Sequence, residues 1–193
     1  MKNNTLFTTI SSGKFKGKKV FLPSLETTRS TKNIVKNSFF NTIQNEIYGK
    51  TFIEVFGGSA LMAMEALSNG ASKTYAIEID KNAYNLTKKN VSSLNCDDIK
   101  SINADTFKAT PKIIKENSDI ILYIDPPFDI RDGFNDIYDR VWDMLRNSKS
   151  SDIYLVVMEH ISSYAAPEAK FGYTKFKSRT FGKTTLSYYQ LEQ

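Results

Sequence analysis

Near the start of the chain, apolar residues first alternate with basic and polar ones and then switch to a helical spacing. Residues 6–22 alternate around Ser11-Ser12-Gly13 and Lys16-Gly17, which predicts a small β-hairpin or meander. Beyond Thr31 the apolar positions recur every three or four residues, as on one face of a helix, at Ile34, Val35, Phe39, Phe40, Ile43 and Ile47. Thr31 is a candidate N-cap for that helix.

From residue 50 onward, short apolar runs alternate with longer amphipathic segments. The pattern predicts strands over 51–56, 73–79, 99–103, 119–124 and 153–158, with helices over 59–69, 82–94, 107–116 and 134–145 between them. Residues 119–124 are almost all apolar, as expected of a central parallel strand buried on both faces. Two further strands, 173–181 and 184–190, are predicted to pair antiparallel through Gly182-Lys183.

This order of elements predicts the fold class α/β, with a doubly wound, Rossmann-like sheet that is parallel except for one antiparallel strand. We expect residues 1–48 to form a basic extension of hairpin and helix, and residues 49–193 to form the α/β domain. Ligands of such sheets bind outside the carboxyl ends of the strands. The residues at those ends are therefore the candidate site.

Composition narrows the class of protein. The 193 residues are 40% hydrophobic and 24% charged, as in ordinary globular domains, and no apolar run suits a membrane span or a secretion signal. We therefore expect a cytoplasmic protein. The lone Cys96 and lone His160 exclude an internal disulfide and a Cys/His zinc site, and we expect no metal. We interpret His160 as a surface histidine and Trp142 as helix packing.

Charge is distributed unevenly along the chain. Residues 1–40 carry a net charge of +7 and residues 170–193 a net charge of +4, whereas the segment between them is acidic. Basic runs are often only solvated faces, but two basic ends can also form one phosphate-binding surface. Under that second interpretation the RNA-binding candidates are Lys14, Lys16, Lys18, Lys19, Arg29 and Lys183.

Three predicted strands end in features that suit a nucleoside. After the first comes Glu54-Val55-Phe56-Gly57-Gly58-Ser59, a turn whose glycines let backbone approach a ligand, although it is neither G-x-G-x-x-G nor a P-loop. Glu78, at the end of the second strand, is placed to accept hydrogen bonds from ribose hydroxyls, and Asp80 suits a helix cap. Asp105, after the third strand, could accept from an adenine amino group. S-adenosylmethionine fits these residues better than a dinucleotide does.

The fourth strand ends in Asp125-Pro126-Pro127-Phe128. Two prolines fix an extended backbone and remove both N–H donors, which leaves the Asp125 carboxylate and the Pro126 carbonyl as convergent acceptors. Such acceptors can hold the two hydrogens of a base amino group and aim its lone pair at a methyl donor. Phe128 offers a face for base stacking, worth roughly 1–3 kcal/mol.

The tetrapeptide resembles the Asp/Asn-Pro-Pro-Tyr/Phe motif of class I amino methyltransferases, and the chain resembles one branch in particular, the bacterial 16S rRNA guanine-N2 methyltransferase family. The resemblance runs from about residue 10 to the last strand. It is carried by the basic hairpin at 13–19, Arg29-Ser30-Thr31 with its helix, the glycine turn with Glu65-Ala66-Leu67-Ser68, Ile77-Glu78-Ile79-Asp80 and the Asp125 motif.

The resemblance implies a S-adenosylmethionine-dependent RNA methyltransferase, acting on ribosomal RNA or on the assembling small subunit, and we expect a monomer. It implies cofactor contacts from Glu54, Phe56, Gly57, Gly58, Ser59, Glu78, Ile79, Asp105 and Thr31, and catalysis at Asp125, Pro126, Pro127 and Phe128. The sequence departs from the family at Glu54 (usually Asp), Ala60 (usually Gly), Ser30 (usually Pro) and Asn37 (usually Glu). Alanine can replace glycine at position 60 if the backbone there is helical, as we expect.

Three alternatives stay open at this point. An adenine-N6 DNA methyltransferase uses the same tetrapeptide, although 193 residues leave little room for a DNA target-recognition domain. A non-catalytic RNA-binding module would have no need of an intact Asp125 motif. A dinucleotide-dependent oxidoreductase is disfavoured because G-x-G-x-x-G is absent.

Overall fold

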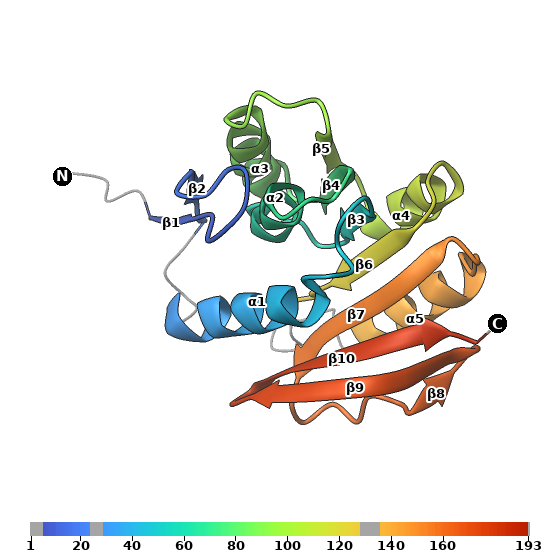
Figure 1. The fold of residues 1–193 in the computed structure, drawn as a ribbon. Coiled ribbons are helices and arrows are strands. Elements are labelled where there is room, and N and C mark those ends of the chain that lie inside the picture. Colours follow the sequence, from blue (N-terminus) through green and yellow to red (C-terminus); the bar gives the residue numbers. More distant parts are fainter. Residues whose placement is uncertain (1–5, 24–28, 128–135, 193) are drawn as a thin grey trace.

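A twisted, mostly parallel sheet forms the centre of the molecule in a computed structural model that describes residues 6–23, 29–127 and 136–192 (Figure 1). Its strands are β3 (Thr51–Glu54), β4 (Lys73–Glu78), β5 (Ile99–Asn103), β6 (Ile120–Ile124), β7 (Ile153–Ile161), β8 (Ala169–Lys170), β9 (Tyr173–Phe181) and β10 (Thr184–Leu191). Their order is β5-β4-β3-β6-β7-β10-β9-β8. The first five of these strands pair in parallel, and β10 then pairs antiparallel with both β7 and β9.

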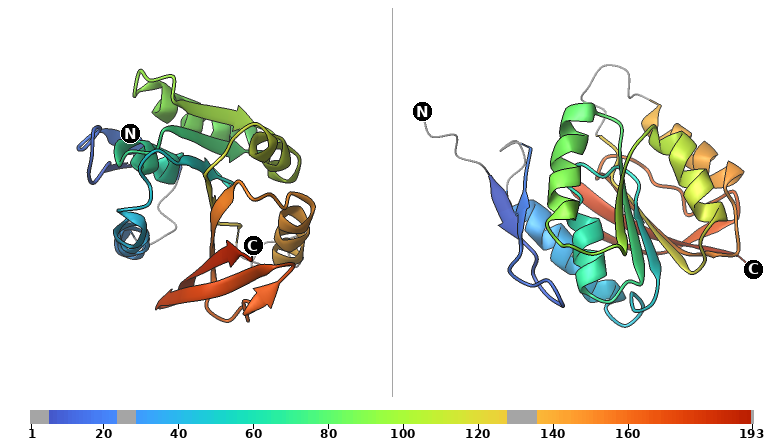
Figure 2. Two further views of the ribbon diagram at one scale, coloured as in Figure 1. Left: turned by 45° about the vertical axis from the view of Figure 1, so that its right-hand side comes forward. Right: turned by 90° about the horizontal axis from the view of Figure 1, so that it is seen from above.

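In the described part of the chain, five helices cover the two faces of this sheet. They are α1 (Arg29–Ile43), α2 (Leu61–Ser68), α3 (Lys81–Ser92), α4 (Thr106–Lys115) and α5 (Ile137–Asn147). The α1, α2 and α3 helices bury their apolar residues on one face, and α4 and α5 do so on the other, so the sheet lies between two helical layers (Figure 2). This is the doubly wound arrangement that the alternating pattern predicts.

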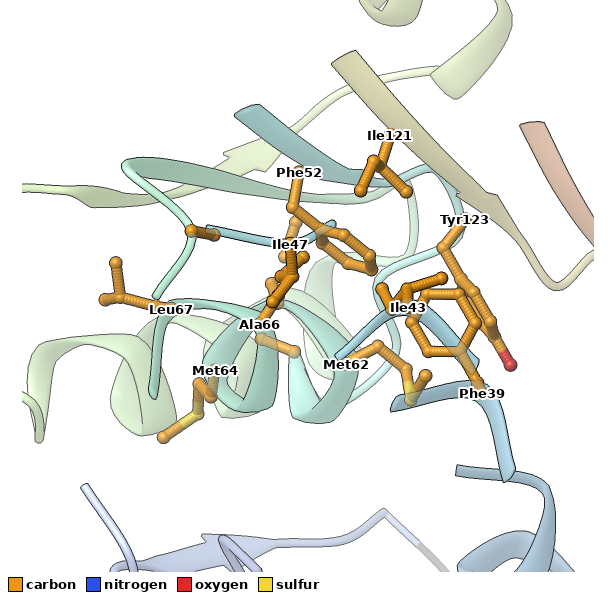
Figure 3. Packing of buried hydrophobic residues seen from close by; sticks show 14 of the residues in the cluster. Phe39, Ile43, Ile47, Phe52, Met62, Met64, Ala66, Leu67, Ile121 and Tyr123 are labelled. Carbon is orange, nitrogen blue, oxygen red and sulfur yellow. The ribbon is translucent and has the colours of Figure 1, made fainter. Parts of the chain in front are cut away.

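Each face has its own hydrophobic core, because alternate residues of a strand point to opposite faces. On the α1 and α2 side, the ring of Tyr123 lies beside that of Phe39, with centroids 4.9 Å apart, and near Phe52 (Figure 3). On the other side, Ile124 and Met158 pack with α5, including the fully buried Trp142. The interpretation of Trp142 as helix packing is therefore confirmed.

The predicted N-terminal hairpin consists of β1 (Phe7–Thr9) and β2 (Lys19–Phe21), paired antiparallel. Its connecting loop packs against the end of α2: the Lys14 N–H donates to the Ser68 carbonyl over 2.8 Å, and the Phe15 N–H donates to the Ser68 hydroxyl over 2.9 Å. Gly13 makes this approach possible, because a Cβ there would lie 1.8 Å from the Ser68 carbonyl oxygen.

A buried ion pair ties the hairpin, α1 and α2 together. Glu65 accepts from the Ser11 N–H over 2.9 Å and pairs with the Lys36 ammonium, which also donates to the Ser11 hydroxyl. Lys36 is 3% exposed and Glu65 is 1% exposed. Lys36, counted above in the basic N-terminal segment, is therefore a structural residue.

Apart from shifts of one or two residues at other element ends, the structure differs from the predicted elements in four places. The α1 helix begins at Arg29, which puts Thr31 in its first turn, so the prediction of Thr31 as the N-cap is wrong. It also ends at Ile43, and Ile47 is buried in the turn beyond it. The β7 strand continues to Ile161, and the two-residue β8 was not predicted. Position 134, the predicted start of the fourth helix, lies outside the described residues.

Candidate active site

Five acidic side chains follow one another along the carboxyl edge of the parallel strands. They are Glu54 at the end of β3, Glu78 at the end of β4, Asp105 just beyond β5, Asp125 just beyond β6 and Glu159 near the end of β7. Because these strands lie in the order β5-β4-β3-β6-β7, the carboxyl groups line one edge of the sheet. This edge is where ligands of doubly wound sheets bind.

The glycine turn after β3 combines a close backbone contact with an open backbone surface. The Gly57 N–H donates to the Ile77 carbonyl over 2.6 Å, and a Cβ at Gly57 would lie 3.0 Å from the Ile77 backbone. Gly58 has a φ of +45°, and a Cβ there would meet no described atom within 4 Å. A ligand can therefore approach the Gly58 backbone directly.

Ala60 adopts a left-handed backbone, with φ 63° and ψ 22°. The expectation that Ala60 follows a helical backbone is therefore wrong. The residue before α2 must turn the chain sharply, and only glycine reaches this region without strain, of about 1–2 kcal/mol for other residues. This is a physical reason for glycine at the corresponding position of the resembling family.

Glu78 connects the glycine turn to the loop after β4. Its carboxyl oxygens accept from the Gly58 N–H over 3.0 Å and from the Asp80 N–H over 2.8 Å. The next residue, Ile79, is 67% exposed, so a large apolar side chain stands beside this carboxylate. Asp80 caps α3 by accepting from the N–H groups of Asn82 and Ala83, as expected.

Asp105 and a small group of aromatic residues continue the edge beyond Glu78. Asp105 caps α4 by accepting from the Phe107 N–H over 2.9 Å. The half-buried rings of Phe56 and Phe107 meet edge-on, 6.0 Å apart, and the Arg140 guanidinium lies 4.2 Å from the Phe107 centroid. Carboxylates beside apolar surface make this stretch suitable for a nucleoside.

Glu54 lies deeper than the other acidic residues. It is 6% exposed, and its carboxyl oxygen accepts from the Ala63 N–H in the first turn of α2 over 2.9 Å. Burial, and to a smaller extent Asp125, raise the pKa of Glu54 to about 8, against the opposing effect of the Ala63 and Met62 N–H groups and of Lys32. Its observed partner is thus a helix N-terminus, a role that sequence reasoning did not assign.

This pKa predicts how the stability of the protein depends on pH. Between about pH 4.5 and 8, folded Glu54 keeps its proton whereas unfolded Glu54 loses it, so its stabilising contribution falls as pH rises, by at most about 1.4 kcal/mol per pH unit. The Glu54→Gln variant keeps an acceptor for Ala63 but no longer titrates. Denaturant unfolding at pH 5, 6.5 and 8 should therefore show a flatter pH dependence than wild type; equal slopes would refute the shift.

Asp125 lies at the end of β6, the central strand, and is half-buried. Burial raises the pKa of its carboxyl group, and the Lys32 ammonium on α1 opposes that rise. Pro126 is buried and Pro127 half-buried beside it. Phe128, the predicted stacking residue, lies outside the described residues.

Sequence reasoning missed Glu159, Tyr123 and Lys32. The Tyr123 hydroxyl donates to the buried Glu159 carboxylate, and Tyr123 also pairs in register with Glu54. Burial first, and then Asp125, raise the pKa of Glu159 to about 8, while the Tyr123 hydrogen bond and Lys32 lower it. The signal for Glu159 was present: it directly follows the apolar run 153–158, as the other acidic residues follow theirs.

The candidate RNA-binding residues do not all lie at this edge. Lys14, Lys16, Lys18 and Lys19 are exposed on the hairpin, whose loop contacts the carboxyl-terminal end of α2, away from the glycine turn. At the other end of the hairpin, the Phe21 backbone hydrogen-bonds the Asn90 side chain, which also donates to the Ser59 carbonyl of the glycine turn. A shared phosphate-binding surface of the two basic ends stays a prediction. Lys183 is exposed in the β9–β10 turn, and the side chains of Arg29 and Thr31 lie outside what the structure describes.

His160 is buried, contrary to the interpretation as a surface histidine. It is 2% exposed, and its Nε2 lies 2.8 Å from the Ser187 hydroxyl. Its ring also packs against Tyr138 and Tyr164. It was misplaced because β7 runs on beyond Met158 and carries His160 into the sheet between β6 and β10.

The family of the chain follows from a match over nearly its whole length. The family model described as Conserved hypothetical protein 95 matches residues 8–190. This chain belongs to that family. Its curated relatives include two proteins named ribosomal RNA small subunit methyltransferase D. The one from Haemophilus influenzae is 27% identical over 94% of this chain and 92% of its own. The one from Buchnera aphidicola is 29% identical over 66% of this chain and 65% of its own.

Solved structures show the same fold. A protein described as a methyltransferase, yhhF from Escherichia coli, has a TM-score of 0.75 and 20% identity, covering 97% of this chain and 99% of its own. Another, described as a methyltransferase complexed with SAH, has a TM-score of 0.63 and 16% identity, covering 89% of this chain and 53% of its own. The Conserved hypothetical protein 95 chain thus has the Rossmann-like methyltransferase fold that the sequence predicts.

Membrane spans and metal-binding clusters are both absent from the described residues. None of the helices in ranges 6–23, 29–127 and 136–192 has the length and apolar character to cross a membrane. Within the same ranges, no group of three or more His, Cys, Asp or Glu side chains is arranged to hold a metal ion.

Proposed function

We propose that this protein transfers a methyl group from S-adenosylmethionine to the exocyclic amino group of an RNA base, namely guanine N2 in small-subunit ribosomal RNA. The observation that carries the proposal is the Asp125-Pro126-Pro127 sequence at the end of the central strand, on the same edge as the glycine turn and Glu78. The names of the curated relatives and the SAH-bound neighbour support it.

The edge of the sheet suits the cofactor. The open backbone at Gly58, together with Phe56, Gly57 and Ser59, would hold its methionine end. The Glu78 carboxylate, already oriented by Gly58, would accept from the ribose hydroxyls, and Ile79 and Asp105 would contact the adenine. We include Glu54 and Thr31 as cofactor residues: Glu54 through the turn that it fixes, and Thr31 through the family resemblance.

The residues of the chain would act by positioning and electrostatics. The cofactor supplies an activated methyl group. The Asp125 carboxylate and the Pro126 carbonyl would accept the two amino hydrogens of the base, fix its orientation and offset positive charge on its nitrogen. Phe128 would stack on the base, which must be unpaired or flipped out to enter. In this proposal, residues 49–193 form the class I methyltransferase domain, and residues 1–48 form an extension that binds RNA.

The test is to incubate the protein with methyl-labelled cofactor and small-subunit RNA, free or assembled with its proteins, and in parallel with duplex DNA, and to identify the labelled nucleoside. N2-methylguanosine is expected. Label in N6-methyladenosine of DNA would favour the DNA methyltransferase alternative, and cofactor binding without transfer to any nucleic acid would favour a non-catalytic module.

Replacing Glu78 by alanine should weaken cofactor binding by about 1.5–3 kcal/mol, the range for hydrogen bonds to a charged group. Titration calorimetry with S-adenosylmethionine measures this, with one site per chain expected. Glu116→Gln, a change on the exposed C-cap of α4, is the control and should bind normally. Undiminished affinity of the Glu78 variant would remove this residue from the cofactor site.

Neutralising Lys14, Lys16, Lys18 and Lys19 together should weaken RNA binding and leave cofactor binding unchanged. The log–log salt dependence should flatten by about 0.7 for each phosphate of single-stranded RNA that the protein no longer neutralises. Neutralising four exposed lysines elsewhere, Lys100, Lys108, Lys112 and Lys115, is a control with the same change in charge. Equal effects of the two quadruple changes would show only non-specific attraction.

A further inference from the structure

Glu159 is held next to the proposed amino-binding group by the pairing of β6 with β7. Ile124 pairs in parallel register with Met158, so Asp125 and Glu159 are the next residues on two adjacent strands. Ile124 and Met158 pack on the α5 face, and Glu159 therefore points to the opposite face, where the Tyr123 hydroxyl contacts it. Two carboxyl groups thus stand side by side at the end of the central strands.

Among the described residues, Glu159 forms its hydrogen bond through one carboxyl oxygen only. The Tyr123 hydroxyl donates to Oε2, and Tyr123 itself is fixed between Phe39 and Phe52. Among the described residues, none donates to Oε1, and the residue retains 7% exposure. Within the described part of the chain, Glu159 is therefore an acceptor oriented by Tyr123 whose Oε1 has no hydrogen-bond donor.

Among the described residues, Lys32 is the cation that interacts with this group of carboxyl groups. The positive charge of Lys32 on α1 attracts the carboxylates of Glu54, Asp125 and Glu159. The negative charge of Asp125 repels the carboxylates of Glu54 and Glu159. Such a cluster of carboxyl groups favours a ligand edge that presents N–H donors. The Watson–Crick edge of guanine presents two adjacent donor groups, the N1–H and the N2 amino group.

We propose that Glu159 is the residue that selects guanine, by accepting a hydrogen bond from its N1–H while Asp125 and the Pro126 carbonyl hold the N2 amino group. This inference rests on the proposed function and deepens it. The Asp-Pro-Pro sequence would recognise only an exocyclic amino group, which adenine and cytosine also carry. Adenine has an acceptor lone pair at N1, which an ionised Glu159 repels. Glu159 therefore supplies discrimination that the tetrapeptide lacks.

The test compares two target bases in one RNA. A synthetic small-subunit RNA fragment carries either the guanine identified by labelling or 2-aminopurine, which keeps the 2-amino group but has an acceptor at N1. Rates are compared at about pH 8.5, because the pKa of Glu159 is raised to about 8 and a protonated carboxyl group can donate as well as accept. Wild type should prefer guanine by at least about 10²-fold, since mispaired buried polar groups are strongly rejected.

The Glu159→Gln variant should reduce this preference to about tenfold or less, because its amide can donate to N1 of 2-aminopurine. Glu159→Asp keeps a carboxylate and should retain most of the preference at a lower rate. The matched control is Glu116→Gln, the same chemical change at the far end of α4, with an unchanged ratio. Calorimetric cofactor binding checks that each variant is folded.

The outcomes separate the two hypotheses. An undiminished guanine preference in Glu159→Gln, with normal guanine methylation by wild type, overturns the role of Glu159 alone. Equal loss of activity on both bases, with the ratio unchanged, assigns Glu159 a purely structural role and likewise overturns the inference. Absence of methyl transfer to either RNA by wild type refutes the proposed function, and the inference with it.

Discussion

Replacing Asp125 by alanine is expected to slow methyl transfer by roughly 10²–10³-fold, the loss typical of a positioned electrostatic group, while the affinity for S-adenosylmethionine stays close to that of wild type. The reason is geometric: Asp125 lies beyond β6, whereas the glycine turn, Glu78 and Asp105 belong to β3, β4 and β5. Initial rates with labelled cofactor and small-subunit RNA, together with calorimetry, measure the two quantities separately.

Asp125→Asn is the matched control for this experiment. Its amide keeps an acceptor oxygen at the same position, and asparagine stands there in part of the resembling methyltransferases. We expect it to retain much more activity than the alanine variant. If both variants were as active as wild type, Asp125 would have no part in holding the base.

Replacing Glu65 by alanine should lower the free energy of unfolding by about 3–5 kcal/mol, a large share of the stability of a typical domain. The change leaves the Lys36 ammonium buried without its counter-ion and removes the acceptor of the Ser11 N–H. Denaturant unfolding at neutral pH measures the loss.

Two further variants test whether the loss of stability comes from leaving a buried charge without its partner. Lys50→Ala breaks a pair in which Asp119 is 64% exposed, and should cost less than about 1 kcal/mol. Replacing Lys36 and Glu65 together by methionine removes both buried charges and should recover most of the stability lost in Glu65→Ala. A loss below about 1 kcal/mol in Glu65→Ala itself would mean that the pair does not hold the N-terminal segment in place.

The fold could be predicted because its signals are local. Strands such as 119–124 and 153–158 are apolar runs, helices have a regular spacing of apolar residues, and the order of the elements then fixes the sheet. The candidate edge followed from the same logic, since acidic residues directly after predicted strands must meet at one side of a parallel sheet. Asp80 as a helix cap was also readable from the sequence.

Features that depend on long-range packing could not be predicted. The contact of the hairpin loop with Ser68 joins segments more than 50 residues apart, and charge alone does not indicate which edge a basic hairpin covers. His160 is buried because β7 continues to Ile161 and pairs there with β10, a strand more than 20 residues further along the chain. The left-handed Ala60 violates a local preference and therefore gives no signal in the sequence.

The docking of the hairpin has a consequence for how its surface can change in evolution. The N–H groups of Ser11, Lys14 and Phe15 and the carbonyl and hydroxyl of Ser12 hydrogen-bond to α2 and its C-cap, and Gly13 contributes only the absence of a side chain. The lysine side chains take no part in this attachment and are exposed to solvent. Attachment and charge are thus carried by different atoms of the same short segment. Substitutions can change the positive charge at these positions one by one, while the loop keeps its place on the domain.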